Sequence, residues 1–139
     1  MDGKLTKPEG VEYAGPDEFA AASKRRYADE EIPGFGWIRI QNLSDFEIGE
    51  WEIEDFVDGA RTDEGMKLMK AGLIVRCLVN GQNERRFHPT QRLMVSAADG
   101  AVVNATFEKC REHCGITRRD IDAIAALKFI QKKSEATTA

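Results

Sequence analysis

The chain has 139 residues, of which 42% are hydrophobic and 32% are charged, and these values are typical of a single globular domain. A domain of this length can bury enough apolar surface to fold without a disulfide or a structural metal. The first residues lack the basic and then apolar layout of a signal peptide, and no apolar run is long enough for a membrane span. Three cysteines, an odd number, fit a reducing compartment. We therefore expect a cytoplasmic protein that makes no contact with a membrane.

Acidic and basic side chains are unevenly distributed along the chain. Residues 1–65 contain 17 acidic and 7 basic residues, whereas residues 66–139 contain 7 acidic and 13 basic ones. The favoured interpretation is that the two halves fold onto each other and neutralise their charges internally. The same asymmetry also fits head-to-tail contact between copies of the chain, or recognition of a charged partner.

Residues 1–35 have the composition of a flexible acidic N-terminal arm, because they are rich in Gly, Pro and acidic side chains and poor in large apolar ones. Within this arm, Pro16 suits the first turn of a short helix over residues 16–28. Phe19 and Tyr27 would lie on one face of that helix. The sequence thus predicts an arm with at most one short helix.

The best strand candidate is Trp37–Ile40, a short run of β-favouring residues with glycines before it and Asn42 after it. A single strand needs a partner to be stable. That partner could come from Glu84–Phe87 or from another copy of the chain. The sequence leaves this choice open.

A helix over Asp45–Asp58 is predicted, because Ser44 is a favourable N-cap residue. The side of this helix expected to face the core carries Phe46, Ile53, Phe56 and Val57. Ile48 and Trp51 point elsewhere at 100° per residue. They are candidates for contact with a partner, or the N-terminal helix around Phe19 and Tyr27 covers them, and the sequence leaves this choice open. A strand remains an alternative interpretation, since Trp51–Glu54 alternates apolar and acidic residues.

Two further helices should form the centre of the fold. The first follows Thr62 as its N-cap and runs into Leu73–Val79, the longest apolar stretch of the chain. The second spans residues 100–114, with Asp99 as its N-cap and Gly115 at its end. Its apolar stripe consists of Val103, Phe107, Cys110 and Cys114. We expect both helices to be buried.

Shorter features connect and follow these helices. Pro89 can start a short helix that ends near Ala97, and Thr117 begins a capping-box pattern for a last helix. Phe129 and Ile130 of that last helix are further candidates for contact with a partner. Residues 132–139 are expected to form a disordered tail.

These elements together predict an α+β fold that is mostly α. We expect a helical core of three to four helices with a short N-terminal β-strand or hairpin. The globular part should be a single helical domain over residues 36–131, between the arm and the tail.

No catalytic motif accompanies these elements. Cys110, His113 and Cys114 are close enough in sequence to suggest a zinc site, but two of them lie on the apolar stripe and are better interpreted as packing residues. Cys77 with His88 or His113 could be proposed as a catalytic pair, although a thiol inside a buried helix is inert. Phosphate-loop and dinucleotide fingerprints are absent from the sequence. We expect a protein that is not an enzyme and that has no metal site and no cofactor.

The segment from Phe107 to Lys133 has the outline of a helix-turn-helix, with Gly115 at the turn. Arg118 and Arg119 would lie near the start of its second helix. This outline supports an alternative function, a small DNA-binding regulator or adaptor. A sequence pI near 5.3 argues against binding of nucleic acid.

The residues from Trp37 to about Ile116 resemble the tail assembly chaperones of long-tailed bacteriophages and related prophages. Members of that family tend to have a short β-segment and then a leucine with a Ser or Thr that starts a helix, as in Ile38–Ser44. An apolar helix, a polar turn and a lone Phe follow, as in Leu73–Phe87. A Val- or Leu-rich helix that ends in Gly is matched by Asp99–Gly115.

One segment departs from the family pattern. Acidic residues often follow the lone Phe in the family, whereas His88–Arg92 stands here. The departure leaves the role of this loop open.

The resemblance implies a chaperone that binds and solubilises the tape measure protein and promotes assembly of the tail tube. The implied partners are the tape measure protein, the tail tube protein and other copies of the chain. Such a protein needs no active site, but it needs apolar residues that remain accessible to a partner. The residues that the sequence offers for this role are Ile48, Trp51, Phe129 and Ile130.

Overall fold

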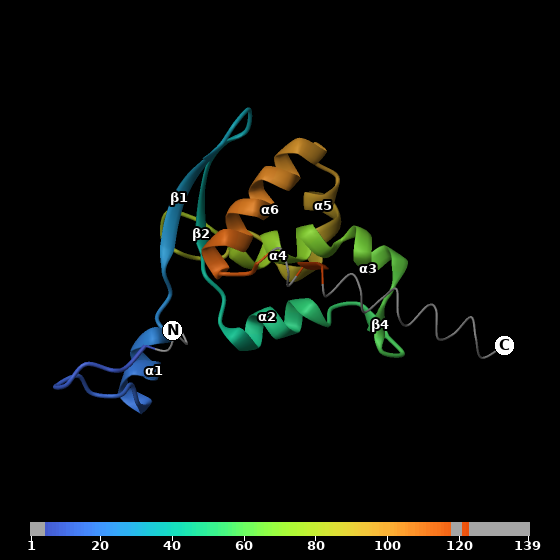
Figure 1. Ribbon diagram of the computed structural model, residues 1–139. Coiled ribbons are helices and arrows are strands. Elements are labelled where there is room, and N and C mark those ends of the chain that lie inside the picture. The colour runs from blue at the N-terminus through green and yellow to red at the C-terminus, as the bar shows by residue number, and fades with distance from the viewer. Residues whose placement is uncertain (1–4, 118–120, 123–139) are drawn as a thin grey trace.

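The computed structural model describes residues 5–117 and 121–122, which form an α+β fold (Figure 1). The elements are α1 (Pro16–Ala22), β1 (Tyr27–Ile32), β2 (Gly36–Gln41), α2 (Asp45–Glu52), β3 (Phe56–Val57), β4 (Ala60–Arg61), α3 (Asp63–Lys67), α4 (Met69–Cys77), β5 (Leu78–Val79), the 3-10 helix η1 (Pro89–Gln91), α5 (Arg92–Ser96) and α6 (Gly100–Cys114). The predicted fold class is confirmed, and the expected helical core with an N-terminal hairpin is matched roughly.

The main sheet is antiparallel and has the order β1-β2-β5. Strand β2 contains the predicted strand Trp37–Ile40, and it pairs with β1 along its whole length and with β5 at Arg39 and Ile40. Of the two partners that the sequence left open, Glu84–Phe87 does not pair with β2, because Arg85 forms a bridge to Val79 of β5 instead. The partner of β2 therefore comes mainly from the N-terminal segment.

The predicted helix over residues 16–28 is shorter than expected. Helix α1 ends at Ala22, and residues 27–32, which we had assigned to the flexible arm, form β1. A tight turn at Gly34, with φ of 76°, folds β1 back onto β2. Ile32 is 1% exposed at the end of β1, and its burial anchors the strand to the core.

Helix α4 is the centre of the core, as predicted, and Leu73, Val75 and Cys77 are fully buried in it. The helix is interrupted at Leu68, which separates α3 from α4. Helix α6 packs between α4 and the sheet through its predicted stripe, in which Phe107 is 1% exposed.

Helix α2 begins as predicted, but the face that it buries is the one that carries Trp51 and not the predicted one that carries Phe46. Ser44 Oγ accepts a hydrogen bond from the Glu47 N–H at 3.2 Å, and the helix ends at Glu52. Trp51 is 0% exposed, whereas Phe46 is 77% exposed and Ile53 is 64% exposed. The prediction was wrong because it assumed that the helix continued to residue 58, which added apolar residues to the side of Phe46.

The chain leaves α2 in a left-handed conformation at Asp55, with φ of 63°, and forms the short β3–β4 hairpin. Arg61 of this hairpin is 3% exposed, and its guanidinium donates to the carbonyl oxygens of Trp51 and Glu52 at 2.8 and 2.5 Å. These carbonyls belong to the last turn of α2, where the Trp51 carbonyl oxygen also accepts a hydrogen bond from the Glu54 N–H at 3.2 Å. The end of α2 thus packs against the buried Arg61 side chain. The sequence had instead predicted that Ile53, Phe56 and Val57 of a longer helix face the core here.

The two halves of the chain are joined by ion pairs, in agreement with the favoured interpretation of the charge asymmetry. The pairs that join basic residues of the second half to acidic residues of the first are Arg76–Glu54, Arg92–Glu54, Arg92–Asp55, Arg85–Glu47 and Lys109–Glu30. These contacts support the internal interpretation of the charge asymmetry.

The predicted caps of the later helices are confirmed. Asp99 Oδ1 accepts a hydrogen bond from the Ala101 N–H at 2.9 Å, and Gly115 ends α6 with φ of 74°. The predicted last helix lies largely outside the described residues, and so do Phe129, Ile130 and the predicted tail. Ile121 is described and is 7% exposed against the core.

Candidate partner-binding groove

An apolar hollow of the described residues is lined by Phe35 of the β1–β2 turn and by side chains of α5 and α6, the elements labelled in Figure 1. Three large apolar side chains beside it are exposed to solvent: Phe35 at 60%, Trp37 at 70% and Met94 at 54%. Exposed apolar side chains that adjoin a hollow are typical of interaction sites. We call this surface the apolar groove and define it by Phe35, Leu78, Phe87, Met94, Val102 and Val103.

The floor of the apolar groove is a hollow of about 270 Å³. Phe35 comes from the hairpin turn, Leu78 follows α4, Met94 belongs to α5, and Val103 belongs to α6. Thr106 is the polar side chain in the lining, and its hydroxyl donates to the Val102 carbonyl oxygen at 2.8 Å. Since that hydroxyl is satisfied within α6, the hollow suits an apolar side chain of a ligand.

A second, more polar hollow of about 600 Å³ continues from the groove along β2, and the two share Phe35, Leu78 and Phe87. Trp37 and Arg39 of β2 line this part. The Arg39 guanidinium pairs with Asp29 at 2.7 Å and donates to the Gly81 carbonyl oxygen at 3.2 Å. The hydrogen bond from Arg39 lowers the pKa of Asp29. These contacts fasten the hairpin to the turn after β5.

The wall formed by α5 is held in place by an ion cluster. Arg92, at the start of α5, pairs with both Asp55 and Glu54, and Arg76 of α4 pairs with Glu54 at 2.8 Å. The hydrogen bond from Arg92 is the main reason that the pKa of Asp55 is lowered. The cluster ties α5 to the loop after α2, so it positions Met94 at the groove.

The cysteines gather in the core, away from the groove. Cys77 Sγ lies 3.7 Å from Cys114 Sγ, and Cys77 and Cys110 are buried. Hydrogen bonding with Cys110 and burial raise the pKa of the Cys77 thiol well above its ordinary value. The Cys77 thiol is therefore a poor nucleophile, as expected for a packing cysteine.

The histidines proposed as alternative partners of Cys77 make other contacts. His88 accepts a hydrogen bond from the Thr90 N–H at 3.2 Å and caps η1, and a ring nitrogen of His113 lies 2.9 Å from the Arg26 carbonyl oxygen. Over residues 5–117 and 121–122, no cluster of three or more His, Cys, Asp or Glu side chains is arranged to hold a metal.

The two sequence-based candidates for partner contact that the structure describes do not line the groove. Trp51 is a core residue, and Ile48 is partly buried against the core. Phe129 and Ile130 lie outside the described residues. Sequence reasoning missed Phe35 and Met94, although the lone Phe87 was a signal that could have pointed to the groove.

Comparisons with known proteins identify no family for this chain. No protein-family model, no curated protein and no solved structure matches the chain. In the part of the chain that the structure describes, the helices are too short or too polar to cross a lipid bilayer. The geometry of the groove and the resemblance of residues 37–116 therefore carry the functional argument.

Proposed function

We propose that this protein is a non-catalytic tail assembly chaperone of a phage or prophage, which acts in the cytoplasm of the bacterial host. It binds helical segments of the tape measure protein, keeps them soluble and promotes their assembly with the tail tube protein. The resemblance of residues 37–116 to that family supports the proposal. The arrangement of core helices behind an N-terminal hairpin fits it as well.

The observation that carries the proposal is the apolar groove. Phe35 and Met94 are more than half exposed at its rim, and its floor is lined almost wholly by apolar side chains. An amphipathic helix binds such a groove by inserting apolar residues spaced three and four apart. A long helical protein has many apolar helix faces of this kind, and a chaperone has to cover them until the protein assembles.

Calorimetric titration of the protein with a helical fragment of the tape measure protein encoded in the same phage or prophage tests this function. Met94→Glu places a charge in the groove and should weaken binding at least about tenfold, because a carboxylate is costly to bury without a partner. Leu93→Glu is the matched control, since Leu93 is 66% exposed on the same helix and lines a separate hollow.

Circular dichroism should show that both variants remain folded. Equal binding by both variants would contradict a role of the groove, and absence of binding by the wild type would contradict the function. Retardation of duplex DNA by the wild type, weakened by salt, would favour the alternative of a DNA-binding regulator.

A further inference from the structure

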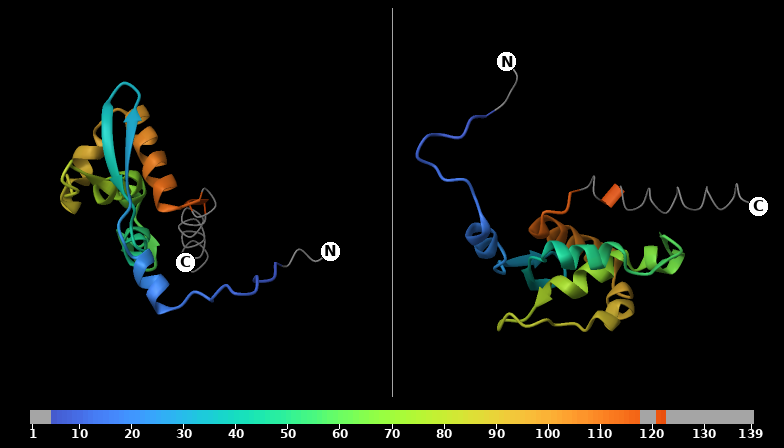
Figure 2. Two further views of the ribbon diagram at one scale, coloured as in Figure 1. Left: turned by 90° about the vertical axis from the view of Figure 1, so that its left-hand side faces the viewer. Right: turned by 90° about the horizontal axis from the view of Figure 1, so that it is seen from below.

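Among the described residues, no strand pairs with the outer edge of β1. Strand β1 is the outermost strand in the order β1-β2-β5. Helix α6 lies beside β1 in the left view of Figure 2 and contacts it, but it forms no strand pair with it. The Asn42 N–H donates to the Arg26 carbonyl oxygen at 3.1 Å, so Arg26, Ala28 and Glu30 direct their backbone groups toward β2. The N–H and C=O groups of Tyr27, Asp29 and Glu31 must then point away from the sheet. An edge of this kind can pair with another strand.

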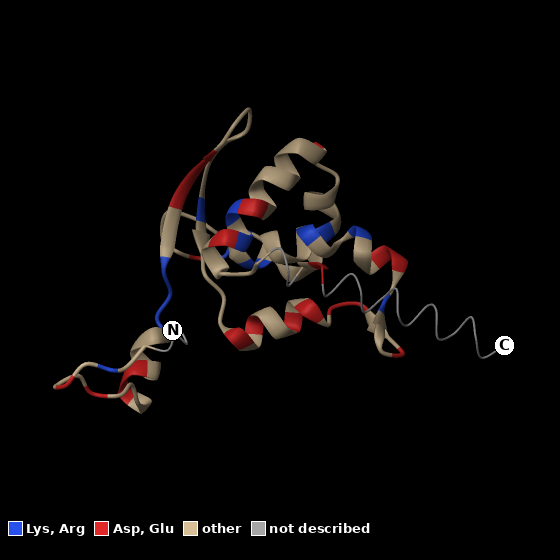
Figure 3. Ribbon diagram, viewed as in Figure 1, with Lys and Arg blue, Asp and Glu red and all other residues tan. Residues whose placement is uncertain are grey.

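Charges of opposite sign lie on the two sides of Ala28 along this edge. The sequence from Lys24 to Glu31 is basic before Tyr27 and acidic after Ala28, and Figure 3 shows the basic segment leading into the acidic part of β1. Two antiparallel copies centred on Ala28 would place Arg25 opposite Glu31 of the other copy and Arg26 opposite Glu30. Opposite charges that face each other across strands stabilise the pair.

The backbone pattern permits this register. Tyr27 and Asp29, whose backbone groups point outward, would face each other and exchange both hydrogen bonds. Ala28 would meet its own copy at a non-hydrogen-bonded position, where Cα atoms approach to about 4.5 Å and a small side chain fits best. A register centred on Asp29 would instead place Asp29 against its own copy, which like charges disfavour.

We propose that a second copy of this chain docks on the edge of β1 in the antiparallel register centred on Ala28. The two three-stranded sheets then form one continuous sheet, with a two-fold axis between the β1 strands. This interface is independent of the apolar groove and of the function proposed for it.

Existing contacts limit the strength of the interface. The Arg25 side chain is 35% exposed and already pairs with Glu47, and the Glu30 side chain is 37% exposed and lies 3.7 Å from Lys109. The intermolecular ion pairs therefore extend networks that are already present. One pair of short edge strands buries less surface than a typical permanent dimer, so we expect a reversible dimer that salt weakens.

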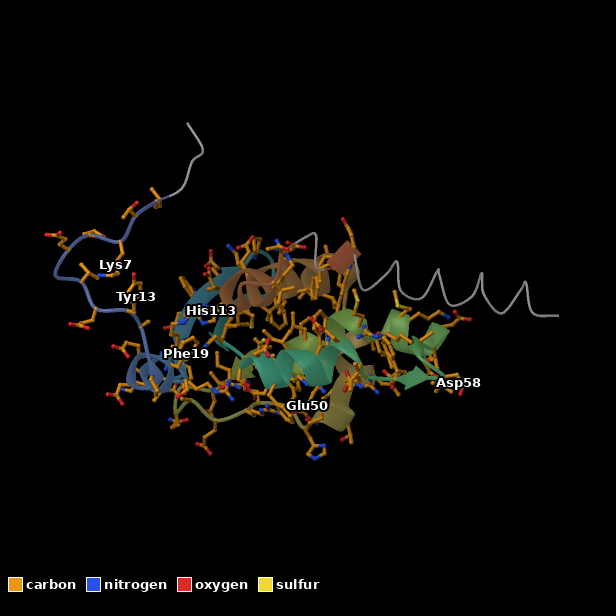
Figure 4. The ribbon with its side chains drawn as sticks, turned by 60° about the horizontal axis from the view of Figure 1, so that its bottom comes forward. Lys7, Tyr13, Phe19, Glu50, Asp58 and His113 are labelled. Carbon is orange, nitrogen blue, oxygen red and sulfur yellow. The ribbon has the colours of Figure 1, made fainter. Side chains whose placement is uncertain are left out.

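Sedimentation velocity of the full chain over a range of concentrations tests the interface. The wild type should show an equilibrium between monomer and dimer, and Glu31→Lys should raise the dissociation constant at least about tenfold by placing like charges opposite each other. Glu50→Lys is the matched control, because this substitution changes the net charge by the same amount but lies on α2, outside the proposed interface (Figure 4). Monomers at all concentrations, or equal effects of the two variants, would overturn the proposal.

Disulfide trapping tests the register itself. In the proposed dimer, Ala28→Cys places two thiols across the axis at a spacing that a disulfide can bridge, and mild oxidation with diamide should give a covalent dimer. In this register Tyr27 lies opposite Asp29 of the other copy, so the two thiols of Tyr27→Cys would not face each other. This variant should give far less covalent dimer. Equal trapping of both variants, or no more than in the wild type with its native cysteines, would show that this register is wrong.

Discussion

The indole Nε1 of Trp51 donates a hydrogen bond to the Met69 carbonyl oxygen at 2.8 Å, and this bond joins α2 to the first turn of α4. The indole also lies 6.4 Å from the Phe107 ring, measured between ring centroids. Trp51 thus connects three elements of the core. Its role is the reverse of the partner contact that sequence periodicity suggested.

Trp51→Ala should lower the free energy of unfolding by roughly 3–5 kcal/mol, as is typical when a buried aromatic is removed. Trp51→Phe should cost less, because it keeps much of the packing and loses the hydrogen bond to Met69. Urea denaturation followed by circular dichroism measures both. A loss below about 1 kcal/mol for Trp51→Ala would show that the residue is not a core anchor.

Gly72 marks a close approach between α4 and the end of α2. A Cβ on Gly72 would lie 2.5 Å from Glu54 Oε1 and 3.2 Å from Trp51 Cδ1. Glu54 cannot move aside easily, since Arg76 and Arg92 hold its carboxylate. Gly72→Ala should therefore destabilise the protein by about 1–3 kcal/mol.

Gly49→Ala is the matched control for this change. Gly49 lies inside α2, and a Cβ there would have no neighbour within 4 Å. Alanine favours the helix over glycine, so this variant should gain about 0.5–1 kcal/mol. Thermal unfolding of the two variants should shift in opposite directions, and shifts of the same sign would contradict the close approach.

Local signals in the sequence were sufficient for several helix ends, although not for the ends of α1 and α2. Ser44, Thr62, Asp99 and Gly115 all act as the predicted caps, because each satisfies backbone groups within its own turn. The burial of α4 also followed from its composition, since a helix that is apolar on most sides has to lie inside the protein.

Features that depend on distant contacts could not be predicted in the same way. Strand β1 contains Asp29, Glu30 and Glu31, which disfavour a strand locally, and it forms because it pairs with β2 along its whole length. The apolar groove likewise combines Phe35 and Met94, which are far apart in sequence. Only the folded chain brings such residues together.

The thiols of Cys77 and Cys114 should react slowly in the folded protein. Hydrogen bonding between the cysteines and burial raise the pKa of both, so little thiolate forms at pH 8. Reaction with a chromogenic disulfide reagent should become fast only after unfolding in urea. Fast labelling of Cys77 at pH 8 without denaturant would contradict this packing.

The same raised pKa values make stability depend on pH in the alkaline range. Unfolded thiols ionise above about pH 8.5, whereas the folded thiols stay protonated, so stability is complete below that pH and falls as pH rises further. The loss should approach about 1.4 kcal/mol per pH unit for each thiol. Cys77→Ala should lower this slope relative to the wild type in urea titrations at pH 8 to 10, and an unchanged slope would contradict the assignment.

Glu47 should contribute stability that is lost in acid. Its carboxylate pairs with Arg25 at 2.6 Å and with Arg85 at 3.1 Å, and the hydrogen bond from Arg25 is the main cause that lowers its pKa from 4.5 to about 2. Because the folded pKa lies below the unfolded one, the contribution is present above about pH 4.5 and disappears as pH falls toward 2.

Solvent around the two arginines limits that contribution to about 1 kcal/mol. Glu47→Gln removes the charge but keeps a side-chain oxygen that can accept the hydrogen bond from the Ser44 N–H. The variant should therefore lower the free energy of unfolding by about this amount at pH 7 and by almost nothing near pH 2. Glu50→Gln, on the exposed side of the same helix, is the control and should leave the profile unchanged. Urea unfolding between pH 2 and 7 gives the comparison. If wild type and Glu47→Gln differ equally at both ends of this range, the ion pairs do not stabilise the fold.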